Sequence, residues 1–266
     1  MKKLFTFLAV TILFSMNAQM DDNSHPSNNT AGTYSVAMGY NTTASGDHST
    51  AMGRNTLASG YTSTAMGRNT IASGNLATAM GRNTTANGLV STAMGESTTA
   101  SDYGSLVIGQ YNSSGSSATS ATDFDLDNTA FVIGNGTGTG ADTSDAFKVM
   151  FNGDTSVSND LTVGGDIVVS SDARLKANIV SLGSTLAKLL LIDGKSYTMK
   201  KNAKQKIGVL AQDIQKVFPE LVTTDDKDML AVNYQGLVPV LINAIKEQDD
   251  KISRLENLVE KLISDK

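Results

Sequence analysis

A 14-residue repeat in the first half of the chain is the feature that most limits how it can fold. Each unit carries an apolar residue followed by glycine, and later a small residue and a second glycine, at fixed offsets. The apolar positions are Met38, Met52, Met66, Met80, Met94 and Ile108. A linker has no reason to keep such a register, so the phase predicts stacked units that bury their apolar faces against one another. The alternative is a disordered Gly/Ser/Thr tract, which composition alone would favour.

The repeat unit reads as two short strands. In segments of the type STAMG and NTxASG, polar and apolar residues alternate and a glycine follows. This pattern indicates strands joined by tight turns. Each unit would then form one coil of a β-solenoid. We expect the inward side chains to be alanine and methionine on the first strand, and alanine with Leu57 or Ile71 on the second. Such a thin core predicts additional burial against other copies of the chain.

Charge and cysteine content exclude several classes of protein. The chain has no cysteine, so no disulfide can stabilise it. Residues 19–171 carry four Lys and Arg against thirteen Asp and Glu, a net charge of −9, whereas residues 172–266 carry +2. Neither part has the basic surplus that nucleic-acid binding needs. No pattern indicates a cofactor or a metal site, and we expect neither.

Three arginines recur in phase with the repeat, namely Arg54, Arg68 and Arg82. In a solenoid they would stack as a row on one face. A solvated row paired with carboxylates is the ordinary interpretation of such a pattern. An acidic ligand bound along the row is the alternative.

The first 18 residues are typical of a secretory signal peptide. Lys2 and Lys3 precede an apolar run from Leu4 to Phe14, and small residues follow, with the cut expected after Ala18. This run is too short to span a membrane, and no later segment is long and apolar enough. We therefore expect a secreted or cell-surface protein without membrane insertion.

The repeat units resemble the head repeats of YadA-like trimeric adhesins over about residues 31 to 110. The resemblance implies a left-handed β-roll in each chain and side-by-side packing of three chains. It also implies binding to a host surface or a glycan through the head.

Residues 112–170 predict a narrow β-rich stem. The segments AFVIGNG, AFKVMFNGD and LTVGGDIVVSSD alternate apolar and polar residues and are separated by Gly-containing turns. Leu161, Val163, Ile167 and Val169 lie in phase, and Ser171 continues their face. We therefore expect Ser171 at the end of a strand.

Beyond Asp172 the pattern becomes helical and mixed. We expect a helix near residues 182–190, a strand at SYTMKK, and a strand leading into a helix that Pro219 ends. A long helix is predicted from about residue 235 to 264. Its apolar positions keep the spacing of a coiled-coil seam: Leu241, Ile245, Ile252, Leu255, Val259 and Leu262, with Gln248 in phase. About three heptads are marginal alone, so the seam predicts oligomerisation. A lone amphipathic helix docked on a domain is the alternative.

The blocks SSDARLKANI, IGVLAQDIQKVFPELV and LAVNYQGLVPVLINAIKEQ resemble the C-terminal intramolecular chaperone of phage endosialidase tail spikes. The resemblance implies a trimeric domain that guides assembly of the β-rich part and then cuts itself away. It places the nucleophile at Ser171 and the general base at Lys176. The cut would fall within Ser170–Asp172, on a side of Ser171 that the sequence leaves open.

A Ser–Lys pair is chemically demanding. An unperturbed lysine has a pKa of about 10.4, so only roughly one in 2,500 is neutral at pH 7. Lowering this pKa by about three units corresponds to roughly 4 kcal/mol and needs an apolar pocket or a nearby cation. Arg174 is the candidate cation, and a trimer interface is the candidate pocket. The alternative is that Ser171 and Asp172 merely cap a turn beside a solvated Lys176.

Together these features predict a secreted homotrimeric fibre of four parts: signal peptide (1–18), YadA-like β-roll head (19–111), β-rich connector (112–170) and α+β chaperone autopeptidase (171–266) with a coiled coil. The protein would be a peptidase only toward itself, in a single turnover. One alternative is an uncleaved trimer whose last domain is a permanent trimerisation module. A glycan-binding fibre is another. An enzyme acting on external glycans is not expected, because no carboxylate pair occurs in an aromatic context.

Overall fold

The computed structural model of the chain describes residues 29–30, 32–115, 117–200, 203–225 and 228–265. They form two compact units, with the division between Ile167 and Val168. The expected signal peptide and its cut after Ala18 lie outside the described residues. Within the described ranges, no helix combines the length and the apolar character that a membrane crossing requires.

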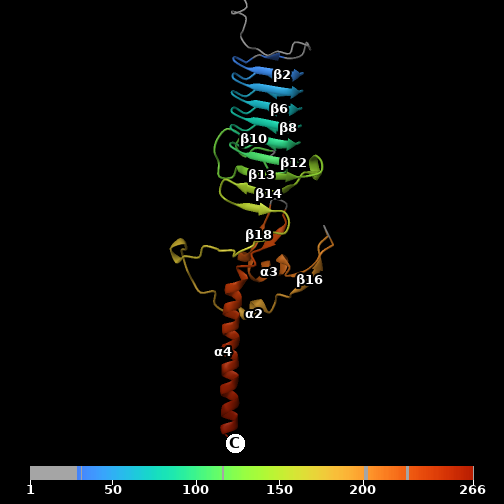
Figure 1. Ribbon diagram of the computed structural model, residues 1–266. Coiled ribbons are helices and arrows are strands. Elements are labelled where there is room, and N and C mark those ends of the chain that lie inside the picture. Colours follow the sequence, from blue (N-terminus) through green and yellow to red (C-terminus); the bar gives the residue numbers. More distant parts are fainter. Residues whose placement is uncertain (1–28, 31, 116, 201–202, 226–227, 266) are drawn as a thin grey trace, which may run out of the picture. The chain divides into compact units, whose positions relative to one another are not determined.

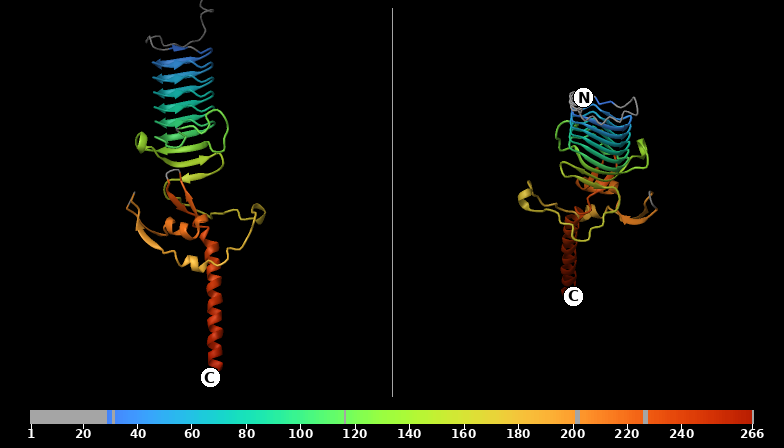
Figure 2. Two further views of the ribbon diagram at one scale, coloured as in Figure 1. Left: turned by 180° about the vertical axis from the view of Figure 1, so that it is seen from behind. Right: turned by 45° about the horizontal axis from the view of Figure 1, so that its top comes forward.

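The first unit is a β-solenoid in which each repeat forms one coil, which confirms the predicted fold class (Figures 1 and 2). Each coil has a five-residue and a two-residue strand. The longer strands are β2 (Val36–Tyr40), β4 (Thr50–Arg54), β6 (Thr64–Arg68), β8 (Thr78–Arg82), β10 (Thr92–Glu96) and β12 (Leu106–Gln110). The shorter ones are β1 (Asn29–Thr30), β3 (Thr43–Ala44), β5 (Leu57–Ala58), β7 (Ile71–Ala72), β9 (Thr85–Ala86) and β11 (Thr99–Ala100). Equivalent residues of successive coils pair in parallel, so Met52 lies opposite Met66.

Alanine, not methionine, lines the interior, so the expected set of inward residues is partly wrong. Ala51 is fully buried while Met52 is half-buried on the outer face. Leu57 is half-buried and Ile71 is 39% exposed, each beside a fully buried alanine. Successive strand residues point to opposite faces, so only one residue of each pair can face inward. A coil of 14 residues encloses little volume, and the smaller side chain occupies it.

Serine and threonine complete this core next to the alanines. The buried hydroxyl residues of the coils are Ser35, Thr42, Ser49, Thr56, Ser63, Thr70, Thr84, Ser91, Thr98, Ser101 and Ser105. Most of them adjoin the turns. The interior therefore contains both methyl groups and hydroxyl groups.

Left-handed backbone positions turn the chain between strands. One such position is filled by asparagine at Asn41, Asn55, Asn69 and Asn83, with φ between +52° and +54°. Asparagine tolerates this region better than most residues. The asparagine side chains form a ladder, in which Asn55 Nδ2 donates to Asn69 Oδ1 at 3.0 Å. Glycine is required at Gly67, because a Cβ there would lie 2.1 Å from the carbonyl oxygen of Gly81 in the next coil.

The solenoid ends in a change of strand direction. Strand β13 (Thr129–Asn135) pairs in parallel with β12, and β14 (Asp145–Met150) and β15 (Thr155–Val157) then add in antiparallel order. The buried carboxylate of Asp102 accepts backbone N–H bonds from Thr119 at 2.6 Å and Thr129 at 2.8 Å. Asp102 thus fixes the loop that leads into β13. A short 3-10 turn, η1 (Gly140–Asp142), precedes β14.

The second unit is a small α+β domain. Its elements are η2 (Ala173–Leu175), α2 (Leu186–Leu189), β16 (Lys195–Thr198), β17 (Gln205–Gly208), α3 (Ala211–Val217), η3 (Pro219–Leu221), β18 (Val222–Thr224), β19 (Leu230–Val232) and α4 (Leu237–Ser264). The pairs β16–β17 and β18–β19 are antiparallel hairpins. Ile214, Phe218 and Val240 form the core that joins α3 to α4. The predicted long helix and the helix before Pro219 are confirmed.

Two local predictions differ from the structure. The helix expected at residues 182–190 is only the single turn α2. The strand expected from Leu161 to Ser171 does not form, and these residues are exposed without regular structure. A strand needs a neighbour to pair with, and within the described residues of one chain no segment pairs with this one.

Candidate Ser–Lys catalytic site

A short turn brings Ser171 and Lys176 together. Asp172 caps η2 by accepting a hydrogen bond from the backbone N–H of Arg174 at 2.9 Å. The turn folds back a segment that would span about 16 Å if fully extended. As a result, Lys176 Nζ lies 2.7 Å from Ser171 Oγ and donates a hydrogen bond to it. Sequence spacing alone cannot predict this contact, because it depends on the turn between the two residues.

The distance suits general-base chemistry. A base must lie within about 2.6–3.2 Å of the atom whose proton it takes. The contact can form whether Lys176 is charged or neutral. The charged amine donates a hydrogen bond to Ser171 Oγ, whereas a neutral amine would accept one from the Ser171 hydroxyl. The pair therefore has the separation that a nucleophile and its base require.

Arg174 contacts Asp172 rather than the dyad. Its Nε donates to both carboxylate oxygens at 3.1 Å, and its Nη2 donates to Oδ2 at 2.6 Å. These hydrogen bonds hold the pKa of Asp172 below its usual range, first through the Arg174 side chain and then through its backbone N–H. The same contact raises the pKa of Arg174. In a single chain, the guanidinium is thus engaged by Asp172 and holds the turn that carries the dyad.

The site is open to solvent in a single chain. Ser170, Ser171, Asp172, Arg174 and Lys176 are all exposed. Among the described residues, no apolar pocket encloses the pair. Exclusion of water from it would therefore need surface from outside this chain.

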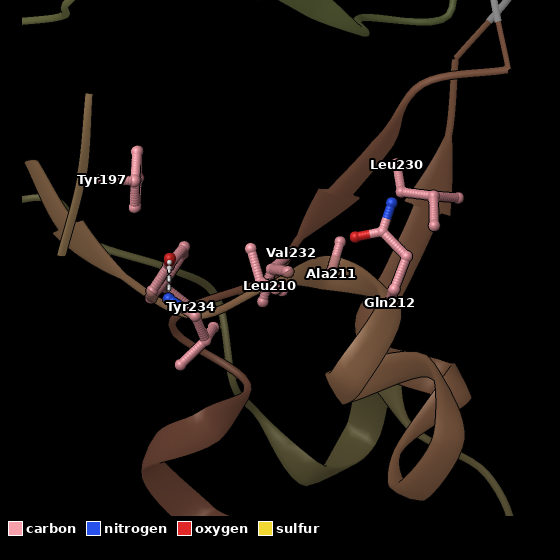
Figure 3. Close-up of a pocket in the computed structure, with 8 residues that line it drawn as sticks. Tyr197, Leu210, Ala211, Gln212, Leu230, Val232 and Tyr234 are labelled. Carbon is pink, nitrogen blue, oxygen red and sulfur yellow. Dashed lines mark hydrogen bonds between the residues drawn. The ribbon is translucent and has the colours of Figure 1, made fainter. Parts of the chain in front are cut away.

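The second unit contains a depression of about 270 Å³ (Figure 3). Neither Ser171 nor Lys176 is among the residues that line it. Tyr197 of β16 and Tyr234 lie on one side of it, and Leu210, Ala211 and Val232 line its floor (Figure 3). The backbone N–H of Val209 donates to the Tyr234 hydroxyl at 3.2 Å. The lining has no carboxylate, lysine or histidine. Sequence reasoning missed this depression because its residues come from three separate segments, around residues 197, 209–212 and 230–234.

Glu247 is a second feature that the sequence did not indicate. This residue of α4 accepts hydrogen bonds from the backbone N–H of Thr185 and from the Ser184 hydroxyl at 2.7 Å. The bond from Thr185, and then that from Ser184, lowers the pKa of Glu247. The carboxylate thereby ties the start of α2 to the long helix, across 62 residues of sequence.

The predicted coiled-coil seam is uncovered in a single chain. Its six apolar residues are between 44% and 67% exposed: Leu241, Ile245, Ile252, Leu255, Val259 and Leu262. The buried residues of α4, Val240 and Ala244, lie at its beginning, where the helix meets the domain core. Beyond Glu247, which contacts the start of α2, the helix is exposed along its length as far as Asp265.

Two family models match separate parts of the chain, in agreement with the two resemblances. The model described as YadA head domain repeat matches residues 31–56, 58–84, 72–89 and 86–112. The model described as chaperone of endosialidase matches residues 171–223, so its match begins at Ser171 and ends before α4. No curated protein matches the chain.

Proposed function

We propose, from the premise that the chain joins YadA-type head repeats to an endosialidase-type chaperone domain, that it is a secreted homotrimeric fibre protein which releases its own chaperone. The domain from residue 171 onward would bring three chains together and then cut itself away. The head, residues 19–111, and the connector, residues 112–170, would remain as the adhesin-like product. The observation that carries this proposal is the 2.7 Å hydrogen bond between Lys176 Nζ and Ser171 Oγ.

Uncovered apolar surface supports the trimer. The outer face of the long-strand sheet carries the methionine row, which runs continuously because equivalent residues pair in register. The connector exposes Leu161, Ile167 and Val169, each more than 60% exposed. The seam of α4 is a third such surface. Contiguous exposed apolar patches usually mark association surfaces, and a threefold assembly would cover all three.

The chemistry begins with Lys176 as the base. The neutral amine takes the proton of Ser171 Oγ, and the oxygen attacks a neighbouring carbonyl carbon. Attack on the carbonyl of Ser170 closes a five-membered ring, whereas attack on the carbonyl of Ser171 itself would close a strained four-membered ring. We therefore assign the cut to the bond between Ser170 and Ser171.

Bond making and breaking then balance as follows. The C–N bond between Ser170 and Ser171 breaks, and the nitrogen takes a proton to become the new α-amine of Ser171. The Ser170 carbonyl is left as an ester on Ser171 Oγ. Water hydrolyses this ester, which yields a Ser170 carboxylate and restores the Ser171 hydroxyl.

Assembly would control the reaction through burial. A lysine releases its proton more readily when apolar surface displaces water from around it. A single chain leaves the dyad exposed, so surface contributed by partner chains would be needed to enclose it. Cutting would then follow correct assembly, and the finished fibre would be held kinetically because the chaperone is no longer attached.

Intact mass of the purified chain tests the proposal. Wild-type protein should yield two fragments that meet between Ser170 and Ser171, and Ser171→Ala should remain at full length because it lacks the nucleophile. Ser170→Ala is the matched control, since it removes the neighbouring hydroxyl and should still be cut. A wild-type chain that stays intact as a trimer would instead support the permanent trimerisation module.

A further inference from the structure

The positive charge of the solenoid lies in one row. Residues 19–171 contain only four Lys and Arg, and three of them are Arg54, Arg68 and Arg82. Each is the last residue of a long strand, and the parallel pairing places them directly above one another. All three are exposed. A unit with an excess of acidic residues thus concentrates its cations along a single line.

The spacing of this row is fixed by the backbone. Neighbouring strands of a sheet lie about 4.8 Å apart, so the guanidinium groups repeat once per coil. The asparagine ladder follows directly in sequence, with Asn55, Asn69 and Asn83 adjacent to the three arginines. An asparagine amide has two donor hydrogens and two acceptor lone pairs. The ladder uses one donor and one acceptor of each inner member, which leaves polar capacity beside every arginine.

The contacts within the chain define the two ends of the row. The guanidinium of Arg54 lies over the ring of Tyr40, 5.6 Å from its centroid. Arg82 forms an ion pair with Glu96 in the following coil. The guanidinium of Arg68, in the middle, has no ion pair or hydrogen bond within the described part of the chain, whereas its backbone carbonyl accepts from Asn83 N–H. Like charges directly opposite one another on neighbouring strands are destabilising, so the row carries an electrostatic cost that an anionic ligand would remove.

We propose that this row, with Tyr40 at one end and Glu96 at the other, binds a linear polysaccharide of uronic acids. A polyuronate carries one carboxylate on each sugar, so its negative charges recur along the polymer as the arginines recur along the row. Carboxylates that face the row would pair with the arginines, a contact that guanidinium geometry favours. The sugar hydroxyls would meet the asparagine amides. The carboxylate of Glu96 would repel the polymer and so mark one end of the bound stretch.

A nucleic acid fits the row less well. Phosphodiester binding draws on many cations and on aromatic rings that stack between bases. This row offers only three cations, with the ring of Tyr40 at one end and that of Tyr111, whose hydroxyl donates to Glu96, at the other. The inference rests on the adhesin-like part of the proposed function and not on self-cleavage.

Calorimetric titration of the full chain with a galacturonic acid tetramer tests the inference. Arg68→Gln removes a contact and should weaken binding about tenfold, the change expected for one charge-assisted hydrogen bond. Glu96→Gln frees Arg82 and removes the repelling carboxylate, so it should tighten binding. Lys148→Gln, which removes the remaining cation of the same part of the chain, is the matched control and should leave affinity unchanged.

Three results would overturn the inference. These are equal binding of a neutral glucan tetramer, equal binding of a glutamate tetrapeptide, and an affinity that Arg68→Gln leaves unchanged. An absence of binding by the wild-type chain would also overturn it. Intact mass, measured on the same samples, keeps the two proposals separate. A chain that cuts itself but binds no uronate contradicts this inference alone, whereas an intact chain that binds uronate contradicts self-cleavage alone.

Discussion

At the scale of single residues, the solenoid interior contains buried hydroxyl groups that have no hydrogen-bond partner. Among the buried side chains of the coils, Ser49, Thr56, Ser63, Thr70 and Thr84 have hydroxyl oxygens without a hydrogen bond, as does Thr98. A buried hydroxyl without a partner costs about 1–3 kcal/mol. The methyl group of threonine offsets part of this cost by filling space in the core. Valine has the same shape without the hydroxyl.

We therefore expect Thr70→Val to stabilise the head by about 1 kcal/mol, because it removes an unpaired buried hydroxyl without changing the volume. Thermal unfolding of the full chain measures the effect. Thr78→Val, on the half-buried outer face of β8, is the control and should change the unfolding temperature little. A lower unfolding temperature for Thr70→Val would mean that the hydroxyl has a partner in solution.

The role of Lys176 is also decided at the residue scale. Lys176→Arg keeps the positive charge and can still donate a hydrogen bond to Ser171. Arginine does not give up its proton in proteins, however, so it cannot act as the base. We expect Lys176→Arg to remain uncut on a denaturing gel, while Lys246→Arg, in α4, is cut normally. Cutting by Lys176→Arg would show that a positive charge near Ser171 suffices.

At the scale of elements, contacts between segments that are distant in the sequence hold the second unit together. Helix α2 is a single turn and would not be stable by itself. Its start is bonded to Glu247 of α4, and Thr185 Oγ1 also donates to the carbonyl of Val240 at 3.1 Å. These bonds satisfy backbone donors that a helix leaves open at its beginning. The position of α2 therefore depends on α4.

Glu247→Gln should destabilise this unit in a pH-dependent way. The pKa of Glu247 is lowered in the folded state, so its stabilising effect is complete above the ordinary carboxyl pKa. The effect is lost as pH falls through the lowered value. Urea unfolding should show wild type more stable than Glu247→Gln at neutral pH, with the difference shrinking on acidification. Glu256→Gln, on the exposed part of α4, should match wild type throughout. A pH-independent difference would rule out the carboxylate as its cause.

At the scale of the whole molecule, each unit leaves apolar surface exposed. The methionine row, the connector and the seam of α4 share this property. The core of each coil is alanine with serine and threonine, so the head buries little apolar area on its own. Assembly would supply burial that a single chain cannot provide.

The seam offers the sharpest test of assembly. Leu255→Lys places a charge on the seam and should reduce a trimer to single chains in light scattering, because a buried unpaired charge is strongly unfavourable. The change is best made together with Ser171→Ala, so that the coil stays attached. Asn257→Lys, off the seam, should stay trimeric. A trimer that survives Leu255→Lys would assign assembly to the head instead.

The solenoid and its register follow from the 14-residue period of the sequence. Each coil contacts mainly its neighbours, so a strict period is enough to fix which residues pair. The period does not reveal which face of a strand points inward. Alanine rather than methionine occupies the interior because a coil encloses only a small volume. The spacing and the surrounding blocks indicated Ser171 and Lys176 as a pair. Only the three-dimensional turn capped by Asp172 sets their separation.

Tertiary structure alone decided the contacts between residues far apart in the sequence. Arg174 was expected beside Lys176, yet its guanidinium binds Asp172, because that carboxylate lies within the same short turn. Glu247 reaches Thr185 across the domain, and no local pattern records such a contact. The strand expected from Leu161 to Ser171 did not form, and no segment among the described residues pairs with it. Local repetition determines register, whereas burial and long-range partners depend on how the chain is packed.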